Sequence, residues 1–172
     1  MKLGRRAILA LPLSAAPALG QSVWYAVRGV DHSFIVDMPG EPLYKVIDAA
    51  SSTGQRYANH SYSLESARLS FVAQTSLSPA GIDTSDARRA LQAVLDERAA
   101  RLEGGKWTRV DWRQVQGMPA VESTGPVQGG RVLRQLVVLR GSRIVSLASL
   151  GQADAVRGPD AERFFQSLRF PS

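Results

Sequence analysis

Residues 131–150, RVLRQLVVLRGSRIVSLASL, decide the fold of this chain. Two runs rich in Val, Leu and Ile flank Gly141-Ser142, a two-residue loop with glycine where a type II′ hairpin turn requires it. The turn sets the pairing of the two strands and brings Arg140 opposite Arg143. It also pairs apolar residues on each face: Val138 with Val145 and Leu136 with Leu147 on one, Leu139 with Ile144 and Leu133 with Leu150 on the other. We therefore expect an antiparallel sheet that is covered on both sides.

Two amphipathic helical patterns supply this cover. The first follows the capping residues Asp83–Asp86 and ends at Gly104-Gly105. Its apolar residues recur at helical spacing: Leu91, Val94, Leu95 and Leu102. On its polar side, Glu97 and Arg101 are spaced as an i,i+4 ion pair. The second pattern begins at Pro159, which suits a first helical turn, and has one apolar stripe: Ala161, Phe164, Phe165 and Leu168.

The remaining segments outside the hairpin are strand patterns separated by turn residues. They cover approximately residues 22–28, 33–37, 43–51, 55–65, 68–77, 106–115 and 120–127. No repeat, low-complexity tract or long linker divides residues 21–172, so we expect a single domain. The predicted class is α+β, and the predicted architecture is an α/β/α sandwich with a central antiparallel sheet flanked by helices.

Residues 1–20 have the three-part plan of a secretory signal peptide. Basic residues come first, Ala7–Leu13 is apolar, and the small residues Ala18 and Gly20 fit cleavage before Gln21. This apolar run is shorter than the roughly 20 residues that span a bilayer, and no later segment approaches that length. We expect a mature protein without a transmembrane segment, in the periplasm or outside the cell.

The route of export has two interpretations. Arg5-Arg6 followed by Ala7–Ala10 resembles the twin-arginine signal, whose carriers cross the membrane already folded. Gly4, however, stands where that signal usually has Ser or Thr. The alternative is a general secretory signal whose basic end holds two arginines.

Composition excludes several classes of function. The 172 residues are 44% hydrophobic and 21% charged, which is typical of a folded domain. The lack of cysteine excludes disulfides, cysteine nucleophiles, thiolate zinc sites and iron–sulfur clusters. Three of the 21 Lys and Arg residues lie in the signal segment, and the other 18 face 15 Asp and Glu, which leaves a charge of +3. This small excess gives no reason to expect a nucleic-acid partner.

No segment carries a catalytic, metal or cofactor motif. Neither of the two histidines, His32 and His60, has motif residues around it, and there is no G-x-S-x-G elbow. His60 shares a strand face with Tyr62 and is expected to be a hydrogen-bonded structural histidine. Gly125–Arg131 has the wrong spacing for a phosphate loop, and the acidic residues lack EF-hand spacing. We predict no cofactor, no metal site, no catalytic residue and no enzymatic activity.

A basic, aromatic surface is the strongest candidate site in the sequence. Seven basic residues face two acidic ones between Gly104 and Leu150, and an arginine–aromatic surface is a common composition of binding sites. The candidate partner-binding residues are Trp107, Arg109, Arg113, Arg134, Arg140 and Arg143. Strand alternation predicts that Trp107 shares a face with Arg109 and Arg113, while Trp112 points to the core. The alternative role of these charges is protection of sheet edges.

Three segments carry a family resemblance. Residues 34–42, FIVDMPGEP, resemble the F-x-V-x-x-P-G-x-P opening strand of bacterial PsbP-like proteins, which are related in fold to PsbP and the Ran-binding Mog proteins. Residues 116–122, QGMPAVE, are similar to the family's G-x-P-A-x-E segment, and residues 164–170, FFQSLRF, resemble its closing F-x-x-S-F-x-F. The resemblance implies an α/β/α sandwich that acts as an accessory or interaction module. It implies no reaction and no catalytic residue.

The leading hypothesis is an exported, non-enzymatic binding module that recognises an envelope protein or a small acidic ligand. Two alternatives stay open. One is a small periplasmic hydrolase that uses His60 or His32, and the other is a peripheral binder of anionic lipid that uses the arginine-rich half of the chain.

Overall fold

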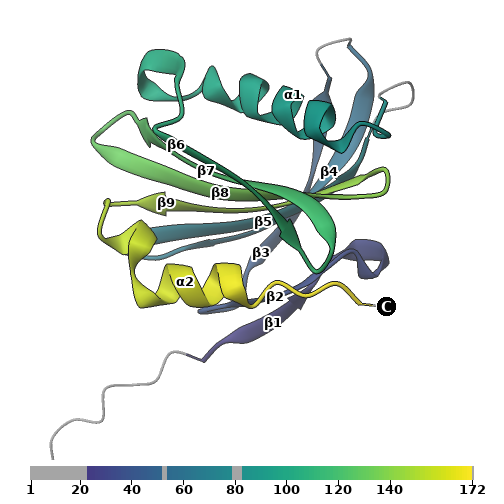
Figure 1. The fold of residues 1–172 in the computed structure, drawn as a ribbon. Coiled ribbons are helices and arrows are strands. Elements are labelled where there is room, and N and C mark those ends of the chain that lie inside the picture. Colours follow the sequence, from purple (N-terminus) through teal and green to yellow (C-terminus); the bar gives the residue numbers. More distant parts are fainter. Residues whose placement is uncertain (1–22, 52–53, 79–82, 172) are drawn as a thin grey trace, which may run out of the picture.

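The structure is a computed structural model and describes residues 23–51, 54–78 and 83–171 (Figure 1). The predicted signal peptide and its cleavage site lie outside the described residues. The described residues form a seven-stranded sheet, a two-stranded sheet, two α-helices and three short 3-10 turns. None of these helices is both long enough and apolar enough to cross a membrane.

The large sheet is antiparallel throughout, in the strand order β3-β4-β5-β9-β8-β7-β6. Its strands are β3 (Leu43–Ala50), β4 (Arg56–Glu65), β5 (Leu69–Leu77), β6 (Arg109–Val115), β7 (Met118–Val127), β8 (Arg131–Arg140) and β9 (Arg143–Gly151). Neighbours in this order are also consecutive along the chain, except that β5 pairs with β9. The predicted strands agree with these bounds to within three residues.

The β8–β9 hairpin has the predicted register. Arg140 lies opposite Arg143, and Val138 lies opposite Val145. Gly141 has a φ of +61°, which a type II′ turn requires at the first loop position. Because this hairpin is in the middle of the sheet, its apolar side chains face cover on both sides, as its sequence predicts.

Helix α1 (Ala87–Ala99) packs on one face of the sheet, over β7 and β8. It begins at Asp86, whose carboxylate accepts a hydrogen bond from the backbone N–H of Arg89 at 3.0 Å. The buried residues between helix and sheet are Leu91, Leu95, Val121, Val137 and Leu139. This small core fixes the helix above the half of the sheet that contains β6 to β9.

The predicted continuation of α1 through Leu102 to Gly104 is wrong. The helix ends at Ala99, where its hydrogen bonds tighten to the i,i+3 spacing of a 3-10 turn. Leu102 is nevertheless buried, because its side chain packs on Gly125 of β7. A Cβ atom added at Gly125 would lie 2.7 Å from Leu102 Cδ1, so a larger residue there would force the Leu102 side chain to move.

Helix α2 (Pro159–Gln166) covers the other face, together with a two-stranded sheet formed by β1 (Tyr25–Arg28) and β2 (Ile35–Met38). Pro159 is in the first turn of α2, as predicted. The predicted stripe is buried: Ala161, Phe164, Phe165 and Leu168. It belongs to the main core, whose other large members include Phe34, Met38, Phe71, Leu136 and Leu147.

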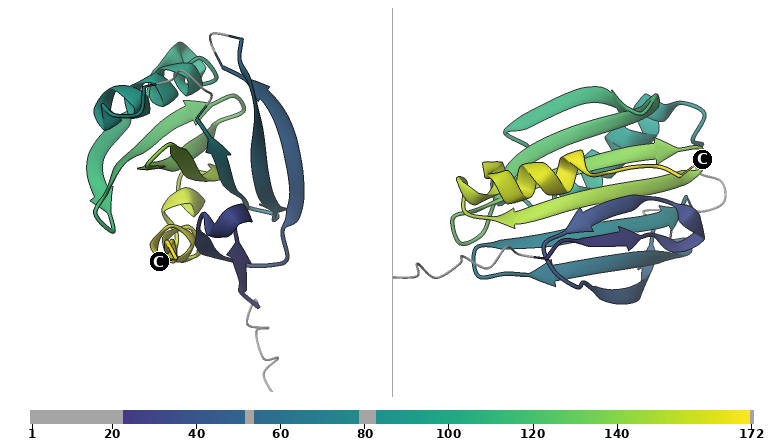
Figure 2. Two further views of the ribbon diagram at one scale, coloured as in Figure 1. Left: turned by 90° about the vertical axis from the view of Figure 1, so that its right-hand side faces the viewer. Right: turned by 90° about the horizontal axis from the view of Figure 1, so that it is seen from below.

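The α+β class and the central antiparallel sheet are confirmed, but the α/β/α sandwich is only partly correct. Figures 1 and 2 show α1 on one side of the sheet and α2 with β1 and β2 on the other. The second layer is therefore mixed, because a two-stranded sheet shares it with the helix. In addition, α1 covers β7 and β8, and it does not extend over the sheet face of β3 and β4. This incomplete cover creates the candidate site.

Candidate functional site

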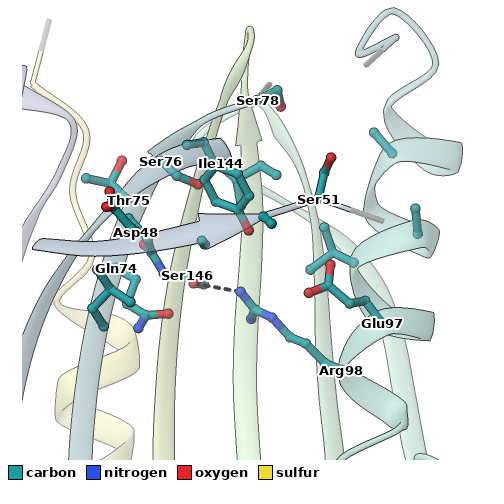
Figure 3. A pocket seen from close by; sticks show the side chains of 18 of the residues that line it. Asp48, Ser51, Gln74, Thr75, Ser76, Ser78, Glu97, Arg98, Ile144 and Ser146 are labelled. Carbon is teal, nitrogen blue, oxygen red and sulfur yellow. Dashed lines mark hydrogen bonds between the residues drawn. The ribbon is translucent and has the colours of Figure 1, made fainter. Parts of the chain in front are cut away.

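A cavity of about 800 Å³ lies between α1 and strands β3 to β5 (Figure 3). Its origin is a change in the side chains on the sheet face that points toward α1. Beneath the helix they are apolar, as at Val137 and Leu139. Beyond it they are polar: Asn59, Gln74, Ser76 and Ser146. The volume falls within the roughly 300–1,000 Å³ of typical small-molecule sites.

Arg98 extends from the last turn of α1 into this cavity (Figure 3). Its Nη1 donates a hydrogen bond to Gln135 Oε1 at 2.8 Å, and its Nη2 donates to Ser146 Oγ at 3.2 Å. Gln135 is buried and donates from Nε2 to Ser123 Oγ at 2.9 Å. The two acceptors of Arg98 are thus neutral, and no ion pair within the described segments includes it.

The electrostatics of Arg98 favour an anion. Burial lowers the pKa of the Arg98 guanidinium, because desolvation disfavours its charged form; nearby Glu97 raises the pKa and Arg101 lowers it by smaller effects. Arginine nevertheless stays protonated in proteins, so the cavity contains a positive charge. Of its five N–H groups, two donate to acceptors among the described residues, and the other three are left without an acceptor there. The planar guanidinium matches the geometry of a carboxylate or phosphate.

Acidic side chains are also present around the cavity. Asp48 and Asp96 line it, but neighbouring side chains already donate hydrogen bonds to each of them. Glu97 and Arg101 line it too, and the predicted ion pair between them is not formed. The i,i+4 spacing is correct, but each side chain instead lies at the cavity wall. Glu97 is therefore the group that most opposes an anion near Arg98.

Two of the predicted partner-binding residues belong to an ion-pair network on the face opposite α1. Arg134 Nε contacts Glu122 at 2.8 Å, and Arg134 Nη1 contacts Glu162 of α2. Arg113 joins the network through Glu122 at 3.0 Å. Burial acts to lower the pKa of Arg134, but its hydrogen bonds to Glu162 and Glu122 outweigh burial, and the pKa is raised. The network connects α2 to the sheet.

Arg140 and Arg143 lie side by side as predicted, and groups of the protein itself relieve their repulsion. Arg140 donates to three backbone carbonyl oxygens, those of His32, Ser33 and Pro171. Arg143 forms an ion pair with Asp31 at 3.0 Å. These contacts tie the β8–β9 turn to the β1–β2 connection and to the C-terminal segment. Partner binding by these arginines remains a prediction.

The placement predicted for Trp107 is wrong. Its Nε1 donates to the backbone oxygen of Leu95 at 3.0 Å, so Trp107 packs beneath α1 in the same cluster as Trp112. The cause is the start of β6 at Arg109: strand alternation does not extend back to residue 107. Arg109 and Arg113 point to the opposite face, and Arg109 pairs with an acidic residue of its own strand. The predicted arginine–tryptophan surface therefore does not form.

The histidines lie apart from the cavity. His60 is a hydrogen-bonded residue of β4, as predicted: its Nδ1 is 2.8 Å from Tyr44 Oη, and the two rings stack. His32 is exposed and lies in a 3-10 turn with a φ of +53°. In the part of the chain that the structure describes, no group of three His, Cys, Asp or Glu residues is placed to hold a metal ion.

The sequence contained a signal for Arg98 that charge counting misses. Leu91, Leu95 and Leu102 define the apolar stripe of the first helical pattern, and Arg98 lies seven residues after Leu91 on that same stripe. A charged residue on the buried side of a helix needs a partner inside the protein or a bound ligand. Clustering in the sequence favours the strand arginines instead, although groups of the protein itself already contact them.

Comparison with solved structures is informative about the fold. No protein-family model and no curated protein matches the sequence. The structure is similar to the solution structure of cyanobacterial PsbP (CyanoP) from Synechocystis sp. PCC 6803, with a TM-score of 0.56 and 11% sequence identity. The match covers 93% of this chain and 99% of that protein. At this identity the match concerns the fold, and the chain has the PsbP-like fold that its three sequence segments predict.

Proposed function

We propose that this chain is an exported, non-enzymatic binding module and that the cavity beside α1 binds a small acidic ligand. The observation that carries the proposal is the Arg98 guanidinium, a partly buried cation that has two neutral acceptors and no carboxylate partner in the described segments. Removing an ion from water costs on the order of several kcal/mol, and a partly buried charge without a charged partner bears part of that cost. An anionic ligand offsets that cost at the position where Arg98 has three N–H groups left.

Hydrolysis has less support than binding. Neither histidine is among the described residues that line the cavity, and His60 Nδ1 is already engaged by Tyr44. A histidine that activates a nucleophile must lie within hydrogen-bond distance of it in a pocket that admits substrate. The sequence resemblance, which implies accessory or interaction modules, agrees with a binding role.

Attachment to anionic lipid also has less support. That mechanism needs exposed cationic side chains that are free to approach phosphate groups. The arginines of the candidate surface contact carboxylates or carbonyl oxygens of the protein, as at Arg134, Arg140 and Arg143. Arg134 and Arg143 are also largely shielded from solvent, since their side chains are 13% and 16% exposed.

The test is a comparison of anion binding by matched variants. Phosphate, acetate and succinate are titrated into the purified protein, and the thermal midpoint and calorimetric heat are measured. A ligand that binds only the folded state raises the midpoint. We expect Arg98→Gln to abolish the effect. Arg101→Gln, which removes the same charge from the cavity wall, is the control and is expected to retain most of it.

A third variant, Glu97→Gln, should change anion binding in the opposite direction to Arg98→Gln. It removes the acidic group that opposes an anion near Arg98, so it should tighten binding. Equal midpoint shifts in the wild type and Arg98→Gln would contradict the proposal, since the anion would then act elsewhere.

A further inference from the structure

The floor of the cavity offers hydrogen-bonding groups that the protein does not use. Asn59, Ser76 and Ser78 line it, and no side-chain hydrogen bond engages them within the described ranges. The Ser78 Oγ is buried and has no hydrogen-bond partner among the residues that the structure describes. A buried hydroxyl without a partner is costly and is uncommon in folded proteins. These groups indicate that the ligand is polar along the sheet side and not only where it meets Arg98.

The opposite wall has an apolar part and a charged part. The N-terminal half of α1 contributes the apolar side chains Ala90, Ala93 and Val94, and the chain from Asp96 to Arg101 contributes charged ones, Arg98 among them. On the sheet side, Ile144 of β9 adds one apolar group. A ligand that fills this cavity therefore faces polar groups of β4 and β5 along the sheet, apolar groups near Ala90 and Val94, and the charge of Arg98 at one end. An acyl chain would bury the polar groups of the floor without forming hydrogen bonds to them, and a free phosphate would leave the apolar part of the wall exposed to water.

We infer that the ligand is a short peptide, bound in an extended conformation with its C-terminal carboxylate on Arg98. This inference rests on the proposed function, because it adds a ligand class to the same site. An extended peptide has backbone N–H and C=O groups along its length and side chains that project from it. The backbone groups hydrogen-bond to Asn59, Ser76 and Ser78, while the side chains pack on α1.

The length of the cavity matches about four peptide residues. Arg98 marks one end, since its acceptor Ser146 lies opposite Gln74 in the β5–β9 pairing. Ser78 marks the other end, four positions further along the chain (Figure 3). At about 3.3 Å per residue these positions are roughly 13 Å apart. An extended peptide spans about the same distance in four residues.

The experiment uses tetra-alanine as the probe, with a free or an amidated C-terminus, and compares it with octanoate and inorganic phosphate. Binding to the purified protein is measured by calorimetry. We expect the free acid to bind about 10- to 100-fold more tightly than the amide, the size of a hydrogen-bonded charge contact. Arg98→Gln should remove this preference. Asn59→Leu should weaken binding of the free-acid peptide and should leave binding of octanoate unchanged or make it tighter.

Each other outcome overturns a specific step. Tighter binding of octanoate or phosphate than of tetra-alanine contradicts the peptide inference and leaves the acidic-ligand proposal in place. Equal binding of the acid and the amide contradicts the carboxylate contact with Arg98, and with it the proposal that this cavity recognises an acid. Binding of none of the three acidic probes contradicts the proposed function itself. The acid and amide comparison needs no variant, so it stands even where a substitution impairs folding.

Discussion

Replacing Arg134 by methionine should destabilise the protein by about 3 kcal/mol, because Arg134 holds two carboxylates in a largely buried network. The Arg134 and Glu122 side chains are 13% and 15% exposed. Loss of one partner from a buried ion pair costs about 3–5 kcal/mol. We place the effect at the lower end because Glu122 keeps Arg113 at 3.0 Å, and because Glu162 is 42% exposed and regains water. The methionine side chain retains part of the packing on Phe165.

Urea unfolding followed by tryptophan fluorescence measures this difference by linear extrapolation. The control is Arg109→Met, which breaks an ion pair in which Arg109 is 74% exposed. A surface pair contributes less than about 1 kcal/mol, so the control should change the free energy of unfolding by no more than that. Equal and small effects of the two substitutions would refute the structural role of the network. Arg134 would then be available to an external partner, as the sequence predicted.

Three further predictions concern other parts of the chain. Arg143→Glu should lower the thermal midpoint, because it replaces the guanidinium that lies 3.0 Å from Asp31 by a second carboxylate, which repels Asp31; an unchanged midpoint would contradict this ion pair. The exported protein should have an intact mass that begins at Gln21, and replacing Arg5-Arg6 by two lysines should block export if the twin-arginine interpretation is correct. Replacement of either histidine by alanine should leave ligand binding intact in a folded variant, whereas lost binding would revive the hydrolase alternative.

The fold was predictable where local patterns act alone. The hairpin around Gly141 has the predicted register, since a two-residue loop allows one pairing and the apolar residues on each face agree with it. The α2 stripe and the N-terminal end of α1 near Asp86 follow in the same way from periodicity and capping. Errors begin where an element ends. The predicted strand alternation extends two residues too far, to Trp107, and the predicted helical periodicity extends too far at Leu102.

The candidate site was not predictable in the same way, because its parts come together only through tertiary structure. Arg98 belongs to a helix, Gln74 to β5 and Ser146 to β9, and nothing in their sequence spacing brings them to one cavity. Clustering in the sequence indicated the strand arginines instead. Clustered charges are more easily paired with neighbouring acids, as Arg109 is with Asp111. The isolated arginine on an apolar helical stripe was the better indicator of the candidate site.

The pairing of β5 with β9 has a consequence for how the protein assembles. Strands β3 to β5 form one meander and strands β6 to β9 another, and each is built from turns between consecutive strands. The β5–β9 seam joins residues about seventy positions apart, as at Gln74 and Ser146. Closing so long a loop has an entropic cost, and folds that depend on such distant contacts form more slowly than folds built from local contacts. Because the cavity straddles this seam, neither meander contains it alone, and the proposed ligand can bind only after the two halves of the sheet have docked.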